Sequence, residues 1–283
     1  MIIDCGSREL DLSAPVVMGV LNVTPDSFSD GGKYIDPQRA VDHAKQMIEQ
    51  GARIIDIGGE STRPGAVLVS VEEELRRTIP VIEQVSKFAD VLVSIDTSKP
   101  EVMRQAVAAG ARIINDIRAL TEPEALRAAA STGAAVCVMH MQGQPDNMQT
   151  APQYTNVVAE VHRYLAERIA ACAQAGISRS KIMIDPGIGF GKTLQHNLEL
   201  LSHLPTFSDL SCPLLIGVSR KSMIGKLLDR TVDERISGGV ALATAAMLAG
   251  AKIIRTHDVS ETVDAVRVAT SLLERGYTCG NDI

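Results

Sequence analysis

Short apolar runs alternate with longer segments of helical periodicity along almost the whole chain. Segment 39–50 is a clear helical case, because its apolar residues recur every three or four positions and so share one face. Similar patterns occupy segments 100–109, 155–175, 233–249 and 260–275. Helices that separate short buried strands are typical of a parallel sheet.

Eight apolar runs predict the strands of this sheet. Three of them follow one template, Gly-Ala-basic-Ile-Ile, in segments 51–56, 110–115 and 250–255, and segment 133–140 is a looser copy. Each time, the glycine follows a helical pattern, which predicts a helix that ends at a left-handed glycine and leads into a buried strand. The other four runs are segments 16–20, 91–95, 182–184 and 214–218.

This alternation predicts an α/β protein with a single (β/α)₈ TIM barrel. Eight parallel strands close such a barrel, and 283 residues are close to its usual size. An open doubly wound sheet has the same alternation, so this alternative stays open at this point. We expect residues 1–14 to form an N-terminal hairpin that caps the barrel bottom, residues 15–275 to form the barrel, and residues 276–283 to form a tail.

The composition of the chain bears on its partners and on its cellular compartment. The chain is 45% hydrophobic, enough for a sizeable core, and its net charge of −6 argues against nucleic acid as a partner. Five dispersed cysteines without a C-x-x-C spacing favour reduced thiols in a cytoplasmic protein. Neither a signal peptide nor a membrane span is predicted, because the first residues lack a basic segment and no run reaches the ~20 apolar residues of a span.

Polar residues close every predicted strand. In a (β/α)₈ barrel the carboxyl ends of the strands carry the active site, so these residues are candidates for function. A lone Asp after a strand is more often a helix N-cap or the start of a turn, as could hold for Asp96 or Asp185. That interpretation weakens when many such residues meet at one barrel mouth, because unpaired buried carboxylates are costly. The strand-closing residues are Asn22, Asp56, Asp96, Asn115, His140, Asp185, Ser219 and the segment 255–257.

One group of these residues suits a flat heterocycle. Asp96 and Asp185 can accept hydrogen bonds from ring and amino N–H groups, whereas Asn115 and Lys221 can donate to ring oxygens and nitrogens. Charge-assisted hydrogen bonds of this kind contribute about 1.5–3 kcal/mol each, so the group would discriminate as well as bind.

A second group is cationic and suits an anion. Arg63, Arg255 and His257 come from separate strand ends, and Asn22 lies nearby if the first and last strands are neighbours. Guanidinium groups and an amide oxygen fit a phosphorylated group with a divalent metal. For Arg63 alone, a solvated loop charge is an equal alternative. Zinc binding by His257 is not expected, because the six histidines show no metal-site spacing.

Two further motifs suggest chemistry that the spacing does not support. Segment 187–193 resembles a phosphate-binding loop, but it has three residues where a Walker A motif has four. Ser219 lacks the G-x-S-x-G context of a nucleophilic serine. Ser222 could instead hold a carboxylate, together with the N-terminus of a following helix.

The loops after the first two strands are long and polar. Segments 24–32 and 58–65 are rich in Gly and Ser, and they carry Phe28 and Pro64. An ordinary solvated loop is one interpretation. The apolar residues favour another, in which the loops are lids that close over a substrate.

At these residues the sequence resembles dihydropteroate synthase, the enzyme family of the folate pathway that sulfonamides target. The resemblance covers roughly residues 15–275, and its motifs are long and occur in order. The motifs are segments 18–32, 56–65, 95–98, 114–117, 185–190, 219–222 and 255–257. The resemblance implies a transferase that condenses 6-hydroxymethyl-7,8-dihydropterin diphosphate with p-aminobenzoate to 7,8-dihydropteroate and diphosphate. It also implies Mg²⁺ as cofactor and a homodimer.

The resemblance also implies roles for individual residues. The residues that match pterin readers are Asp96, Asn115, Asp185 and Lys221, and those that would line the slot are Ile117, Met139, Phe190 and Gly217. The residues that match diphosphate contacts are Thr62, Arg63, Arg255 and His257, with Asn22 as the Mg²⁺ ligand. The residues expected at p-aminobenzoate are Phe28, Pro64, Ser219 and Ser222.

The mechanism expected from these residues is electrostatic. No activated nucleophile is visible, so we expect diphosphate to leave first and to generate a pterin cation. The residues expected to act in catalysis are Asp96, Asp185, Lys221, Arg255 and His257, and Asp30 would add negative charge near the cation. Asp56 and His140 are interpreted as structural.

Two other functions stay open on the sequence. One is a methyltetrahydrofolate–corrinoid methyltransferase, which would leave the anion-binding residues such as Arg63 without a purpose. The other is a non-catalytic pterin-binding paralogue, which typically lacks loop or anion-site residues that this chain retains.

Overall fold

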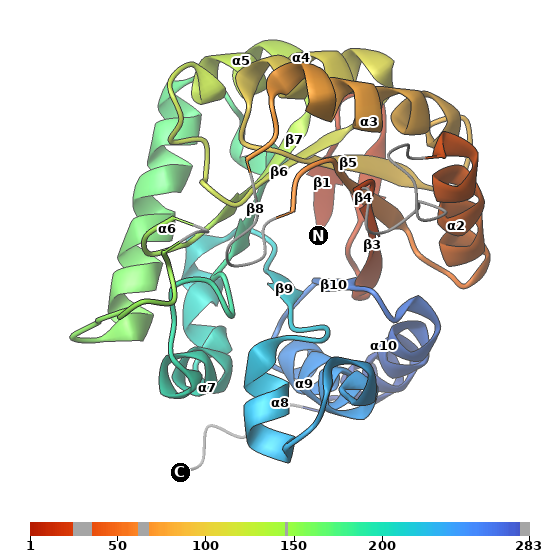
Figure 1. Cartoon of the computed structure of the whole chain (residues 1–283). Coiled ribbons are helices and arrows are strands. Elements are labelled where there is room, and N and C mark those ends of the chain that lie inside the picture. Colours follow the sequence, from red (N-terminus) through yellow and green to blue (C-terminus); the bar gives the residue numbers. More distant parts are fainter. Residues whose placement is uncertain (25–35, 62–67, 145–146, 278–283) are drawn as a thin grey trace.

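A computed structural model describes residues 1–24, 36–61, 68–144 and 147–277. Eight parallel strands surround a common axis, with helices outside them (Figure 1). The strands are β3 (Val16–Asn22), β4 (Ile54–Gly58), β5 (Leu92–Asp96), β6 (Ile113–Asp116), β7 (Ala135–Met139), β8 (Ile182–Asp185), β9 (Leu215–Gly217) and β10 (Ile253–Thr256). Hydrogen-bonded pairing runs from β8 through β3 to β10 and β9, and a bridge between Ile184 and Leu214 joins β8 to β9. The predicted barrel is therefore confirmed, and the open-sheet alternative is excluded.

Helices cover the outside of the barrel. They are α2 (Pro37–Glu49), α3 (Val71–Val85), α4 (Pro100–Ala109), α5 (Ala125–Thr132), α6 (Val157–Gln174), α7 (Leu194–Ser202), α8 (Ser222–Leu228), α9 (Ile236–Leu248) and α10 (Val259–Leu273). Short 3₁₀ turns are η1 (Arg179–Lys181), η2 (Leu204–Leu210) and η3 (Val232–Glu234). The glycines of the sequence repeat adopt positive φ angles where helices end, as predicted: Gly51, Gly110, Gly133 and Gly250. No helix in the described ranges is long and apolar enough to cross a bilayer.

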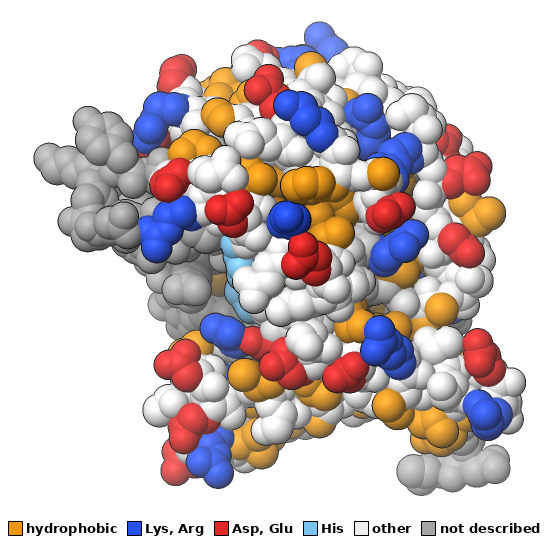
Figure 2. Space-filling model, turned by 90° about the vertical axis from the view of Figure 1, so that its right-hand side faces the viewer, with side chains coloured by type: hydrophobic (Ala, Val, Ile, Leu, Met, Phe, Trp, Pro, Cys, Tyr) orange, Lys and Arg blue, Asp and Glu red, His pale blue; other side chains and the backbone are white. Residues whose placement is uncertain are grey.

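Charged side chains of both signs lie interspersed on the outer face shown in Figure 2. Helix α3 illustrates how they pair, because Glu73 contacts both Arg76 and Arg77 at 2.7 Å along one helix face. Arg77 is largely buried, whereas the Glu73–Arg76 pair is partly exposed, and exposed pairs contribute at most about 1 kcal/mol each. The barrel is therefore held by its apolar cores rather than by its surface charges.

The N-terminal hairpin closes the bottom of the barrel. Its strands β1 (Ile2–Asp4) and β2 (Glu9–Asp11) pair in antiparallel register. Ile3 and Leu10 point inward and join an apolar cluster with the first inward residues of the barrel strands, such as Met18 and Ile54. A second, larger cluster fills the space between the strands and the helices. The barrel interior therefore has an apolar floor at its lower end.

Polar residues stand directly above this floor. Successive side chains of a strand point to opposite faces, so the residue two positions after an inward apolar residue also points inward. That step leads from Ile54 to Asp56 in β4, and from Ile113 to Asn115 in β6. Asp56 therefore lies inside β4 and does not close it as expected, because β4 pairs with β5 as far as Gly58. Asn115 likewise comes one residue before the end of β6.

The hairpin contact gives a test of the barrel floor. Ile3→Ala should destabilise the protein by about 2–5 kcal/mol, because it removes a side chain that is buried in the floor cluster. Ile2→Ala is the matched control, since the Ile2 side chain next to Ile3 is 56% exposed on the other face of β1. Urea unfolding measures both variants. Equal effects of the two changes would show that the hairpin is not part of the core.

Candidate active site

A pocket opens at the carboxyl ends of the barrel strands. Its walls are formed by Val20, Asp96, Asn115, Ile117, Met139, Asp185, Phe190, Gly217, Ser219, Lys221, Arg255 and His257. Every one of these except Val20 was predicted from the sequence as a site residue. The structure thus brings residues from seven strand ends into one place, hereafter called the mouth pocket.

An arginine occupies the base of the mouth pocket. The Arg255 guanidinium donates through Nε to Asp56 Oδ2 at 2.6 Å and through Nη2 to Asp96 Oδ2 at 2.8 Å. The Asn115 amide donates to the same Asp56 oxygen at 3.0 Å. Three strands on one side of the barrel are therefore linked to β10 through a single cation.

Burial sets the protonation of this cluster. Removal from water raises the pKa of Asp96 to about 7, although Arg255 opposes the shift, and the nearby Asp56 carboxylate adds to it. Burial also opposes the charge of Arg255, but Asp56 and Asp96 outweigh it and raise the pKa of the guanidinium. Asp56 is fully buried, and its Oδ1 has no hydrogen-bond partner within the described part of the chain. Asp56 thus supports Arg255 and Asn115 from below, a role that the sequence did not predict.

A second acid–base pair lies across the pocket. Burial raises the pKa of Asp185, while Lys221 and the Gly187 N–H, 2.7 Å from Asp185 Oδ1, oppose the shift. Burial lowers the pKa of Lys221 to about 8. The Lys221 ammonium also donates to the Ile188 carbonyl and lies 4.7 Å from the centre of the Phe190 ring. A cation over an aromatic face is favourable, so this geometry fixes both side chains at the pocket wall.

The turn after β9 aims two predicted residues at the pocket. Arg220 has a φ of 57°, a left-handed conformation that is uncommon for a residue with a Cβ. Its guanidinium binds Asp258 at 2.6 Å, which anchors the turn. Ser219 and Lys221 on either side both face the mouth pocket. Ser219 Oγ lies 3.1 Å from His257 Nδ1 and 3.2 Å from Asp258 Oδ2, so its hydroxyl serves to hold this corner together.

The predicted Mg²⁺ ligand lies at the end of β3. Asn22 pairs in register with Gly58 of β4, and a Cβ at Gly58 would lie 3.7 Å from Asn22 Oδ1 and 3.9 Å from Asp96 Oδ2. Two hard oxygens therefore face the same small space. No cluster of three His, Cys, Asp or Glu side chains suited to a metal occurs within the described ranges. Mg²⁺ commonly takes one or two protein ligands together with phosphates and waters, so these residues fit that ion.

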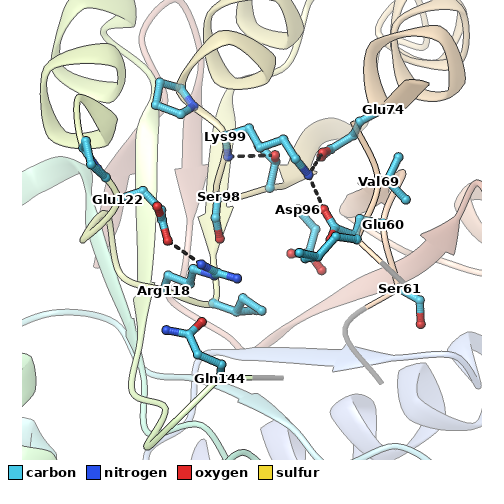
Figure 3. A pocket seen from close by; sticks show the side chains of 15 residues that line it. Glu60, Ser61, Val69, Glu74, Asp96, Ser98, Lys99, Arg118, Glu122 and Gln144 are labelled. Atoms are coloured by element: carbon cyan, nitrogen blue, oxygen red, sulfur yellow. Dashed lines mark hydrogen bonds and ion pairs between the residues drawn. The ribbon is translucent and has the colours of Figure 1, made fainter. Parts of the chain in front are cut away.

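A larger hollow of about 560 Å³ adjoins the mouth pocket and shares Asp96 and Ile117 with it (Figure 3). Lys99 binds both Glu60 and the fully buried Glu74 there. Because Glu74 comes from α3, this contact fastens the residues after β4 to that helix. The predicted recognition residues gather in the mouth pocket, so we place the chemistry there.

The remaining predicted residues are Ser222 and five residues that the structure does not describe. Ser222 is exposed at the first residue of α8 and is not part of the mouth-pocket wall. Five predicted residues lie outside the described residues: Phe28, Asp30, Thr62, Arg63 and Pro64. The roles assigned to these residues stay predictions.

The barrel and its mouth define the class of protein, a (β/α)₈-barrel enzyme with a polar pocket above a buried ion cluster. Residues 18–257 match the family model described as pterin binding enzyme. The chain is 60% identical over 264 residues to dihydropteroate synthase of Escherichia coli K12. This alignment covers 93% of this chain and 94% of that protein. The chain belongs to the dihydropteroate synthase family and is a transferase.

Solved structures agree over the same length. A Yersinia pestis dihydropteroate synthase with a sulfonamide drug superimposes with a TM-score of 0.92, at 51% identity, over 97% of this chain and all of that one. The Xanthomonas albilineans enzyme with 4-aminobenzoic acid has a TM-score of 0.90 at 51% identity, over 96% of this chain and 98% of that one. The same enzyme with 7,8-dihydropteroate has a TM-score of 0.88 at 48% identity, over 96% and 99%.

The raised pKa of Asp96 predicts a pH-dependent stability. The folded protein holds a proton on Asp96 more tightly than the unfolded chain, so this contribution to stability is lost as pH rises from about 4 to about 7. Asp96→Asn cannot titrate, and its free energy of unfolding relative to the parent protein should therefore increase over that window. Urea unfolding at about pH 5 and about pH 8 measures the difference.

Asp264→Asn provides the control, since this Asp is 73% exposed on α10. A stability difference for Asp96→Asn that is the same at both pH values would contradict the assignment.

Proposed function

We propose that this chain condenses 6-hydroxymethyl-7,8-dihydropterin diphosphate with p-aminobenzoate to form 7,8-dihydropteroate and diphosphate. The observation that carries the proposal is the meeting of Asp96, Asn115, Asp185 and Lys221 in one pocket. The Xanthomonas albilineans enzyme, with 4-aminobenzoic acid and with 7,8-dihydropteroate, supports the same two chemical partners.

The pterin ring would enter the mouth pocket edge first. Asp185 accepts from ring and amino N–H groups, and Lys221 and Asn115 donate to ring oxygen and nitrogen atoms. Ile117, Met139 and Phe190 supply apolar walls for a flat ring, and Gly217 leaves room beside it. A ring that lacked these polar atoms would leave the buried charges of the pocket without hydrogen-bond partners. The pocket would therefore select for the pterin.

Negative charge in the pocket favours a cation on the ring carbon that loses diphosphate. Asp56, Asp96 and Asp185 face two cationic side chains, Arg255 and Lys221. A preorganised field of this kind lowers the energy of charge that develops in the transition state. The substitution therefore starts with departure of diphosphate, and p-aminobenzoate adds afterwards.

The leaving diphosphate would be received at the part of the mouth pocket that β10 forms. Arg255 and His257 lie there among the described residues, and Arg63 and Thr62 are assigned to it from the sequence. Mg²⁺ held by Asn22 would neutralise charge on the diphosphate. p-Aminobenzoate would lie between Phe28, Pro64, Ser219 and Ser222.

Available nucleophiles argue for a reaction without a covalent enzyme intermediate. Burial and the nearby carboxylates Asp185 and Asp56 raise the pKa of Cys137 well above its ordinary value, so its sulfur stays a thiol. Ser219 shares its hydroxyl with His257 and Asp258. A triad would place the acid on the far nitrogen of the histidine, whereas Asp258 here contacts the serine itself.

A homodimer is part of the proposal. Helix α9 has no charged residue from Ile236 to Leu248, yet Ala241 and Ala245 on it are exposed. A helix that is apolar on all sides is usually buried, so this face suits a second copy of the chain. Sedimentation should give twice the mass of the chain, and Ala245→Glu should shift the protein to single chains. A parent protein that sediments as one chain would refute the dimer.

The cytoplasmic location stays a prediction.

Product formation tests the reaction directly. Purified protein is mixed with the pterin diphosphate, p-aminobenzoate and Mg²⁺, and 7,8-dihydropteroate is measured by mass spectrometry. We expect product, and we expect its rate to fall after EDTA and to recover with added Mg²⁺. Folded protein that yields no dihydropteroate would refute the proposed reaction. Activity unaffected by EDTA would refute the proposed requirement for Mg²⁺.

Asp185→Asn tests the pocket within the same assay. The change removes a charge that would accept from the ring, so we expect loss of pterin binding and a fall in kcat/KM by about 100-fold or more. Asp264→Asn again serves as control, because it removes an exposed carboxylate of the same type. Parent-like turnover in Asp185→Asn would remove this residue from its role.

A further inference from the structure

One buried lysine has no part in the proposed reaction. Lys192 is 2% exposed and belongs to the segment that resembles a phosphate-binding loop. Its Nζ lies 2.9 Å from His140 Nδ1, and 3.0 Å from the carbonyl oxygens of Gly187 and Phe190. The His140 carbonyl lies at 3.3 Å. Burial first, and then Lys192, lower the pKa of His140 to about 3, so the imidazole is neutral. Burial also lowers the pKa of Lys192 well below its ordinary value, and the two side chains share a hydrogen bond.

Between β8 and α7, six consecutive carbonyl oxygens, those of residues 187–192, accept hydrogen bonds from side-chain donors. Lys192 donates to the carbonyl oxygens of Gly187 and Phe190, and Lys221 donates to the carbonyl oxygen of Ile188. The other donors are Gln149 to Gly189 at 2.8 Å, Tyr154 to Gly191 at 2.8 Å and Asn197 to Lys192 at 3.4 Å. A segment held at six consecutive carbonyl oxygens cannot shift without breaking several hydrogen bonds.

Glycines allow the loop to adopt this shape. Gly187, Gly189 and Gly191 have φ angles of 70°, 84° and 59°, in the left-handed region. A Cβ at Gly187 would overlap the His140 carbonyl, and one at Gly191 would overlap the backbone of Gln142. The loop therefore packs directly against the chain that follows β7.

We propose that Lys192 is a positioning residue, which clasps the β8–α7 loop to His140 and thereby sets the wall of the mouth pocket. The loop carries Phe190, and its Ile188 carbonyl holds the Lys221 ammonium. Loss of the clasp would let both pterin-contacting groups move, while Asp96 of β5 and Arg255 of β10 keep their contacts with each other. The inference rests on the proposed function for the identity of the ring.

Lys192→Met tests the clasp, because it keeps an unbranched side chain as far as Cε and removes Nζ with its hydrogen bonds. We expect the KM for the pterin diphosphate to rise about tenfold or more, since a shift of about 1 Å at a positioning group can cost up to ~100-fold. The KM for p-aminobenzoate should stay within about twofold. Calorimetry with pterin alone should show the same loss of affinity.

Lys181→Met is the matched control. Lys181 also donates to a backbone carbonyl, that of Gly133 at 2.6 Å, but at the other end of the barrel. It should lose stability without a change in pterin affinity. Equal pterin affinity in folded Lys192→Met and the parent protein would overturn the clasp.

Tyr154→Phe decides the question if Lys192→Met does not fold. It removes a single donor to the loop, at Gly191, and should weaken pterin binding by about threefold. Unchanged affinity in that variant would also overturn the proposal. A parent protein that binds pterin in the calorimeter but forms no dihydropteroate would refute the reaction and leave the clasp open to test.

Discussion

The upper half of the barrel depends on one guanidinium group between two carboxylates. Arg255 contacts Asp56 and Asp96, which stand above an apolar floor and are almost wholly removed from water. A buried carboxylate is strongly disfavoured unless it is paired, and loss of one partner of a buried pair commonly costs about 3–5 kcal/mol. Arg255 thus allows acidic groups inside the barrel. Asp56 can then hold Asn115, and Asp96 can face the pocket.

Much of this arrangement follows from local sequence rules. The glycine repeat marked four joints between helix and strand, and the two-residue alternation of strands put Asp96, Asn115 and Asp185 on the inner face. Parallel strands in a closed barrel place their carboxyl ends at one mouth, so these residues had to converge once the fold was known. Recognition of the family motifs added identities that spacing alone does not provide.

Pairwise contacts inside the barrel could not be predicted in the same way. Whether Arg255 meets Asp56 depends on the register of strands that are far apart in the chain, and no local pattern reports that register. Asp56 looked like a strand-closing residue because its run of apolar neighbours ends there. The ladder continues to Gly58, which moves Asp56 one step deeper into the barrel and gives it a structural partner.

Two lysines at the mouth show how surroundings decide function. Lys221 faces the Asp185 carboxylate and an open pocket, so it can exchange a hydrogen bond with a ligand. Burial lowers the pKa of Lys192 well below its ordinary value, and its Nζ has at most three N–H donors while it meets four neutral acceptors within 3.3 Å. It therefore has no donor left for a phosphate. A phosphate loop points its N–H groups at the ligand, whereas this loop turns its carbonyl oxygens toward side-chain donors. The same glycines and lysine build a wall here because the peptide groups face the opposite way.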